Sequence, residues 1–424
     1  MIEEKVGIEG YISKTPGIGG RIKESAEDFY VEEIIDLEKF KEKEGRNLLI
    51  KVKKKNWETL NFARVLSNVL GISQKRVGYS GTKDKNAVSV QYFMIYNADE
   101  KIAEKLREVR LKDAEIEIVC FTSKNLELGD LVGNFFRVKV SDAENGERVE
   151  KITEELKEKG IPNFFGIQRF GSLRLITHEV GKLIIQGKYE EAFWVYVAKP
   201  FEGEREDVRK IREILWNERD AKFGLRELPK YLRYERLLLQ KLREGKNELE
   251  ALLSLPKNLK LMFIHAYQSY LFNRLLSERI REFGNLKEIE RDDFVDFVNF
   301  RKGYKVYSED FSILTDFNSP RISFLKEKGY AILALPLPGY ETKLVGWSGE
   351  KLKEILEEEG IDLESFKSPY PEFSSKGSLR VAEIPFDFER FSYSEGVFEF
   401  FLPKGCYATV FLREYMKSEQ IGFS

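Results

Sequence analysis

The sequence of 424 residues predicts an α+β fold with a mixed, largely antiparallel sheet that is interrupted by a mostly helical insert. Extended apolar runs recur in the first 170 residues and again near the C-terminus. Between them, from about residue 173, apolar residues recur at the spacing of amphipathic helices. Because strand-rich segments lie on both sides of a helical block, we expect the first and last segments to share one sheet.

The first part of this frame is predicted to contain four strands. They are expected over 28–34, 47–53, 87–96 and 129–140. In the last of these, Phe136, Val138 and Val140 fall on one face, because successive side chains of a strand alternate. This pattern indicates a strand that leaves a turn and has one apolar face.

Two helices are predicted between these strands. Apolar residues at helical spacing indicate a helix over 57–70, with Asn56 as its N-cap and Gly71 as its end. A charged amphipathic helix is expected over 147–159, stopped at Gly160. Glycine suits these ends because it adopts a left-handed backbone without strain.

The helical block and the C-terminal segments complete the expected order. Periodicity predicts helices over 206–216, 231–244, 249–255 and 259–283, then short strands and turns over 294–346 and a charged helix over 351–359. Strands are expected over 378–382 and 397–402. The predicted division is therefore a first domain part over 1–172, an inserted domain over 173–370 and a second part over 371–424.

Composition limits the classes of function. Hydrophobic residues make up 42% of the chain, which indicates a globular protein. The formal net charge is only −2, so any surface that binds RNA must be locally basic. Two Cys and two His without ligand spacing argue against a zinc cluster, whereas carboxylate-bound magnesium stays open; no metal ligand is assigned. No signal peptide or membrane-length apolar run is seen, which predicts a cytoplasmic protein.

The strongest candidate for chemistry is Asp84, in the turn Gly-Thr-Lys-Asp-Lys before a strand. The flanking Lys83 and Lys85 favour its ionised form, and an ionised carboxylate can act as a nucleophile or base. The alternative is an ordinary solvated turn former. Lys23 follows two glycines that lack the signature of a nucleotide-binding loop. We interpret Lys23 either as part of a turn or as a fixed cation near the active site.

A second candidate site lies in the segment Asn-Phe-Phe-Gly-Ile-Gln-Arg-Phe-Gly over 163–171. Phe164 and Phe165 point to opposite sides if the chain is extended, so one can enter the core while the other faces a cleft. Core packing is the usual fate of both rings. The interleaved polar residues instead favour a platform for a nucleobase. His265, within a predicted helix, is interpreted as structural.

Six segments, in order between about residues 20 and 415, resemble the TruD family of tRNA pseudouridine synthases, of the archaeal type. They are Lys23 with 27–29, then 81–84, 129–134, 163–171, 268–273 and 402–414. The resemblance implies a pseudouridine synthase catalytic domain with an inserted TRUD domain. It also implies isomerisation of uridine to pseudouridine in tRNA, usually at uridine 13, without a cofactor or protein partner.

The resemblance also implies roles for single residues. Asp84 matches the essential aspartate of the family, and Lys23 matches its active-site cation. Phe165 matches the aromatic residue that stacks on the target base, and Asn163 matches the residue that supports this pocket. Basic and polar residues near these segments are candidates for RNA binding: Lys83, Lys85, Gln168, Arg169 and Arg174.

Two other functions remain open at this point. A non-catalytic RNA-binding or RNA-folding protein could use the same scaffold. A carboxylate-dependent hydrolase of a nucleoside or sugar would usually need a second carboxylate near Asp84, and the sequence identifies none.

Overall fold

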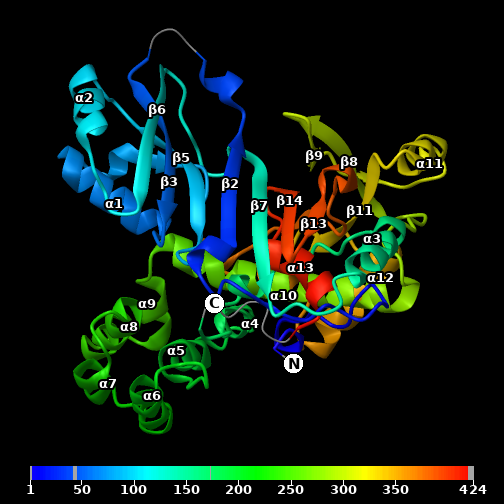
Figure 1. Cartoon of the computed structure of the whole chain (residues 1–424). Helices are drawn as coiled ribbons and strands as arrows, with labels where there is room; N and C mark the ends of the chain where they lie inside the picture. Colours follow the sequence, from blue (N-terminus) through cyan, green and yellow to red (C-terminus); the bar gives the residue numbers. More distant parts are fainter. Residues whose placement is uncertain (1, 42–44, 172, 419–424) are drawn as a thin grey trace.

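The computed structural model describes residues 2–41, 45–171 and 173–418, which contain two sheets (Figure 1). The larger sheet has the order β13-β14-β7-β2-β5-β3-β6, with β1 paired to β7 and β4 paired to β5. Its strands are β1 (Arg21–Ile22), β2 (Phe29–Ile35), β3 (Asn47–Lys55), β4 (Val77–Tyr79), β5 (Val88–Ile95), β6 (Ala114–Thr122), β7 (Leu131–Ser141), β13 (Ser392–Ser394) and β14 (Val397–Pro403). Within this order only β2 and β5 run parallel, so the mixed, largely antiparallel sheet is confirmed.

The two ends of the chain meet in this sheet. β14 pairs antiparallel with β7 along its whole length, from Val397 opposite Lys139 to Pro403 opposite Gly133. The prediction that the first and last segments share one sheet is therefore confirmed. The pairing brings the turn after β14 next to the start of β7, where Lys404 donates its backbone N–H to the carbonyl of Val132.

Helices cover one face of the larger sheet in two groups. α1 (Thr59–Leu70) and α2 (Glu100–Glu108) pack on β3 and β5, around Ile50 and Phe93. α3 (Arg148–Lys159), α10 (Lys257–Phe283) and α13 (Ala408–Met416) belong to a second cluster that includes Phe136 and Phe400. The strand register places all these side chains on the same face.

Between the two helix groups this face carries polar side chains. The register aligns Val52 with Gln91, Lys54 with Ser89, and Ser89 with Val31, two residues before Glu33. Glu33, Lys54, Ser89 and Gln91 are all buried. We call these four side chains the polar strip. Buried polar groups need hydrogen-bond partners, so apolar packing alone does not account for the polar strip.

The helical block contains α4 (Thr177–Ile185), α5 (Tyr189–Ala198), α6 (Glu206–Glu218), α7 (Ala221–Glu227), α8 (Arg233–Arg243) and α9 (Glu248–Leu253), and it leads into the long α10. Figure 1 shows α5 to α9 as a separate group, drawn in green, below α1 and the larger sheet. The predicted helices over 206–216, 231–244, 249–255 and 259–283 are confirmed within a few residues. α10 joins the block to the core, since it packs on α4 and crosses behind the sheet.

The smaller sheet has the order β10-β8-β11-β12, with β9 paired to β8. Its elements are β8 (Phe294–Arg301), β9 (Tyr304–Tyr307), β10 (Ser312–Ile313), β11 (Ala331–Leu337) and β12 (Ser378–Val381), and the helices α11 (Ser319–Glu327) and α12 (Gly346–Glu358) lie between them in sequence. β12 lies beyond residue 370, yet it pairs with β11. The domain boundaries at 172/173 and 370/371 stay predictions.

Two local predictions were wrong. Asn56 does not cap α1, because the helix begins at Thr59 with Glu58 in the N-cap position, while Asn56 has a left-handed φ of 60°. Only turns and strands were expected over 294–346, but Ser319–Glu327 forms α11. This helix has apolar residues on several sides and lacks a clear stripe, so periodicity does not reveal it.

Candidate active site

Lys23 and Asp84 form an ion pair. The Lys23 Nζ lies 2.8 Å from a carboxylate oxygen of Asp84, which stands in the loop between β4 and β5. The Lys23 side chain is only 4% exposed, whereas that of Asp84 is 52% exposed. The ammonium also lies 4.7 Å from the ring centroid of Phe29. A buried cation therefore holds a carboxylate that is half exposed, so that a ligand can reach it.

Buried side chains hold the loop that carries Asp84 in place. The backbone N–H of Lys83 donates to Thr59 Oγ1 at 2.9 Å, and Lys83 Nζ lies 2.6 Å from a carboxylate oxygen of Glu33. Gln91 donates its side-chain N–H to the carbonyl of Gly81 and accepts from Thr59 Oγ1. These contacts fix the residues on the N-terminal side of Asp84 to the polar strip.

Lys83 therefore occupies a different place from the one predicted. Its side chain is buried against Glu33, which neutralises its charge, so the ammonium does not reach a surface phosphate. Lys85, on the other side of Asp84, is exposed, as a residue that contacts RNA must be. The sequence places the two lysines symmetrically around Asp84, but the fold turns only one of them inward.

Lys54 adds a buried cation to the polar strip. Its Nζ donates to Ser89 Oγ at 2.8 Å and to the carbonyl of Trp57 at 3.0 Å. Burial lowers the pKa of Lys54 to about 8, and the charge of Lys83 adds to this effect. The carboxylates of Glu33, Glu58 and Asp84 oppose it. The pKa of Lys54 thus depends on both the cation and the carboxylates around it.

A second group of side chains surrounds Phe165. The carboxamide of Asn273, on α10, accepts from the backbone N–H of Phe165 at 2.8 Å and donates to its carbonyl at 3.0 Å. Phe164 is fully buried in the core, while the Phe165 ring is 9% exposed. One of the two adjacent rings thus enters the core, as predicted, while Phe165 keeps a small exposed part. Its ring contacts Phe272 and Tyr407 edge-on, with centroid distances of 5.5 and 6.4 Å.

Asn163 acts on Phe165 through an arginine that the sequence did not single out. Asn163 Oδ1 accepts from Arg380 Nη2 at 2.8 Å, and its carbonyl accepts from the same guanidinium. The guanidinium carbon lies 4.0 Å from the centroid of the Phe165 ring. Arg380 comes from β12, more than 200 residues away from Asn163. In the sequence it looks like any charged residue of an edge strand.

The remaining candidates separate into two kinds. Gln168 is exposed and Arg169 is partly exposed, with its guanidinium carbon 5.8 Å from the Phe165 ring centroid. Arg174 instead donates to the backbone carbonyls of Val195, Tyr196 and Lys199. Arg174 thus holds the helical block together, and this differs from the RNA contact predicted for it.

Comparisons with known proteins agree over the length of the chain. The sequence profile of the family described as tRNA pseudouridine synthase D (TruD) matches residues 5–415. A tRNA pseudouridine synthase D of Archaeoglobus fulgidus is 60% identical over 418 residues, covering 99% of this chain and all of that protein. A relative of the same name from Methanococcoides burtonii is 40% identical, covering 100% of this chain and 99% of that one.

The chain belongs to the TruD family. A TruD crystal structure from Methanosarcina mazei superposes with a TM-score of 0.80 at 38% identity, covering 98% of both chains. The resemblance of the six segments is thus confirmed, and the protein is an enzyme of the isomerase class.

Along the described residues no helix is long and apolar enough to cross a membrane. Nor do these residues contain a group of three His, Cys, Asp or Glu side chains that could hold a metal ion.

In this TruD protein adjacent strands connect the two groups of side chains. Glu33 on β2 is opposite Asn134 on β7, and Asn134 is opposite Leu402 on β14. The turn after β14 then leads to Tyr407, whose ring contacts Phe165. The fold thus brings Lys23 to Asp84, and Arg380 to Asn163 and Phe165, from separate parts of the chain.

Proposed function

We propose that this chain isomerises uridine to pseudouridine in tRNA, at uridine 13, with Asp84 as the catalytic carboxylate. The observation that carries this proposal is the Lys23–Asp84 ion pair, in which a buried ammonium fixes an exposed carboxylate. The names of the TruD relatives support the reaction and the RNA class. We place the reaction in the cytoplasm, where tRNA is available.

The reaction rearranges one nucleotide without an added reagent. The C1′–N1 bond of uridine breaks, the detached uracil turns, and a C1′–C5 bond forms, while the C5 proton is lost and N1 gains a proton. Asp84 assists the first step either by attacking the nucleotide covalently or by removing the C2′ proton to give a glycal. Lys23 holds the carboxylate in one direction through a charge-assisted hydrogen bond.

The target base must leave its stack in the folded RNA before it reaches Asp84, at a cost of a few kcal/mol. Stacking on an aromatic or guanidinium plane returns roughly 1–3 kcal/mol. Because the Phe165 ring is largely covered, the base contacts its exposed rim and the outer surface of Arg380. Asn163 and Asn273 support this platform from the protein side.

The test is incubation of the protein with unmodified tRNA, followed by carbodiimide labelling of pseudouridine and measurement of free uracil. We expect pseudouridine at position 13 and no free base. Labelling equal to that of untreated tRNA would favour the RNA-binding or RNA-folding alternative. Release of free uracil would favour the hydrolase.

A further inference from the structure

Two arginines lie against the ring of Phe165, and neither pairs with a carboxylate in the part of the chain that the structure describes. The guanidinium carbons of Arg380 and Arg169 lie 4.0 and 5.8 Å from the ring centroid. Within residues 2–41, 45–171 and 173–418, neither guanidinium forms an ion pair. Arg169 makes one side-chain hydrogen bond, from Nε to Ser269 Oγ at 3.3 Å.

The protein holds Arg380 along one edge only. Nε and Nη2 donate to the carbonyl and side-chain oxygens of Asn163, and Nη2 also donates to the carbonyl of Gly405 at 3.0 Å. Nη1 makes no hydrogen bond to the described residues, and it is not among the buried polar atoms that lack a partner. A guanidinium anchored in this way presents a fixed pair of N–H donors to a ligand, with little rotational entropy left to lose.

Elsewhere the same protein neutralises paired arginines with carboxylates. Arg174 and Arg212 share Glu204 and Glu235, with separations between 2.9 and 3.9 Å. At Phe165 neither arginine pairs with a carboxylate of the described residues, although burial lowers the pKa of Arg169. Tyr407 opposes this effect, while the charge of Arg380 adds to it. Two like charges that repel in a half-buried place are stabilised by an anionic ligand.

We propose that Arg169 and Arg380 form a phosphate-binding site, which takes a backbone phosphate of the substrate RNA beside the base at Phe165. This inference rests on the proposed function, because it assigns the anion to the RNA substrate. Arginine suits the task, since its planar donors match the oxygens of a phosphate. A phosphate held here fixes the flipped nucleotide at two points, by its base and by its backbone.

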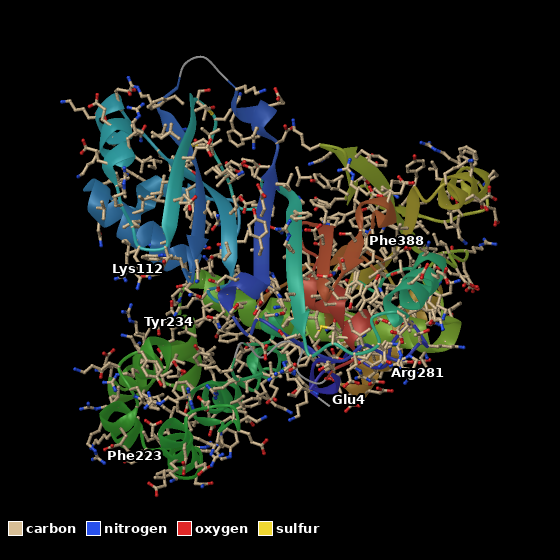
Figure 2. All side chains as sticks on the ribbon, in the orientation of Figure 1. Glu4, Lys112, Phe223, Tyr234, Arg281 and Phe388 are labelled. Atoms are coloured by element: carbon tan, nitrogen blue, oxygen red, sulfur yellow. The ribbon has the colours of Figure 1, made fainter. Side chains whose placement is uncertain are left out.

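The test measures tRNA affinity against KCl concentration in a series of variants that all carry Asp84→Asn, so that turnover does not interfere. Each phosphate contact adds about 0.7–0.9 to the slope of log affinity against log salt. We expect Arg380→Met and Arg169→Met each to lower the slope by up to about one and the affinity by roughly tenfold. The matched control is Arg281→Met on α10, at a position labelled in Figure 2. The Arg281 guanidinium pairs with Glu9 and Glu278. This control should leave both quantities unchanged.

A second arm identifies the source of the phosphate. A neutral methylphosphonate next to the target uridine should weaken binding to Asp84→Asn protein by roughly tenfold, but should not weaken it further when Arg380→Met is present. Additive losses would overturn the proposal, as would an unchanged salt slope in both arginine variants. Inorganic phosphate at millimolar concentration could protect Arg169 and Arg380 from an arginine-modifying reagent while the methylphosphonate leaves the RNA affinity unchanged. In that case the site takes free phosphate and the RNA assignment is wrong.

Folding and function are checked separately. The melting temperature of each variant shows whether Arg380→Met disturbs β12. Arg169→Met gives an independent reading, because Arg169 makes only one side-chain hydrogen bond to the described residues. Pseudouridine formation by the unmutated protein tests the proposed function by itself. A protein that makes pseudouridine but shows no arginine-dependent slope would refute only the phosphate site.

Discussion

The ammonium of Lys83 lies 2.6 Å from a carboxylate oxygen of Glu33, and the two side chains are 6% and 0% exposed. Glu33 also accepts from the Ser80 hydroxyl and, at 3.4 Å, from the backbone N–H of Tyr92. The residue next to Asp84 is therefore tied to the centre of the larger sheet. The position of the candidate catalytic carboxylate of Asp84 therefore depends on a contact inside the core.

Replacement of Glu33 by Gln should damage both stability and turnover. It leaves the Lys83 charge buried without a partner, and breaking a buried pair typically costs about 3–5 kcal/mol. We expect a loss in that range in chemical denaturation and a lower kcat, with little change in RNA affinity. The matched control is Glu32→Gln on the same strand, because Glu32 faces the other side and pairs with the partly exposed Lys51. A loss of stability as large as that of Glu33→Gln in this control would contradict the account.

Removal of the cation beside Asp84 should slow the reaction without unfolding the protein. A charge-assisted hydrogen bond contributes about 1.5–3 kcal/mol, so Lys23→Met should lower kcat by roughly 10- to 100-fold. Lys23→Arg keeps the charge and should recover part of this loss. Single-turnover kinetics with saturating enzyme would measure the chemical step directly. Equal kcat values for Lys23→Met and the unmutated protein would mean that the ion pair does not support catalysis.

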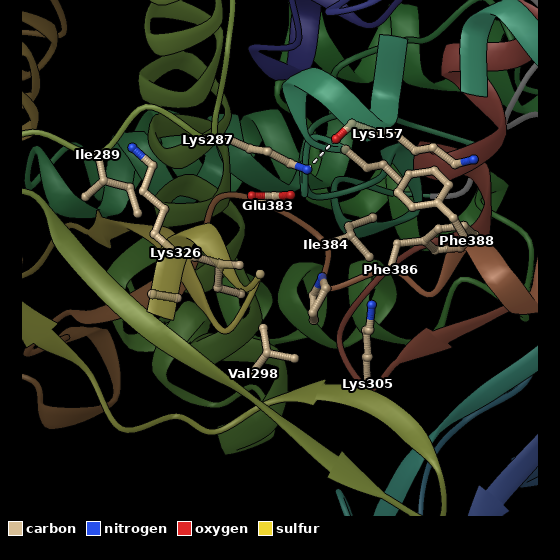
Figure 3. A pocket seen from close by; sticks show the side chains of 15 residues that line it. Lys157, Lys287, Ile289, Val298, Lys305, Lys326, Glu383, Ile384, Phe386 and Phe388 are labelled. Carbon is tan, nitrogen blue, oxygen red and sulfur yellow. Dashed lines mark hydrogen bonds between the residues drawn. The ribbon is translucent and has the colours of Figure 1, made fainter. Parts of the chain in front are cut away.

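A carboxyl group outside the candidate site should make stability depend on pH. Glu383 lines a cavity of about 160 Å³ with Lys157, Lys287, Lys305 and Lys326, yet no described residue hydrogen-bonds its carboxylate (Figure 3). Burial raises the pKa of Glu383 to about 7, and the charge of Lys287 opposes this rise.

Because the folded pKa of Glu383 lies above the ordinary value of 4.5, its contribution is complete below pH 4.5 and is lost as pH rises through 7. Glu383→Gln removes this loss. The variant should match the unmutated protein at pH 4.5 and exceed it by about 1–3 kcal/mol at pH 8. Denaturation curves at the two pH values would measure the stability of the variant relative to the unmutated protein. If this stability difference is the same at pH 4.5 and pH 8, Glu383 is not the group responsible.

Local signals in the sequence predicted the secondary structure of the frame well. Gly71 and Gly160 end their helices with left-handed φ values of 70° and 86°, as expected of glycine after a last turn. Asn56 misled because it also has a left-handed φ, but in the turn before the helix. Its residue type indicates a special backbone conformation without showing whether that conformation is a cap or a turn.

The site depends on contacts that local patterns cannot show. Lys23 and Lys83 are both lysines near glycine turns, and only the fold decides that one meets Asp84 and the other Glu33. Arg380 reaches Asn163 because β12 joins the smaller sheet instead of the larger one. Pairing between distant strands, and not propensity, sets these contacts.

The central claim is that Asp84 performs the isomerisation, and its most direct test is position-resolved pseudouridine mapping on tRNA treated with Asp84→Asn protein. The substitution keeps the size of an exposed side chain, so folding and RNA affinity should be retained. We predict no pseudouridine at position 13 above the level of untreated tRNA, although the variant binds the RNA as the unmutated protein does. Full modification of position 13 by Asp84→Asn would contradict the account.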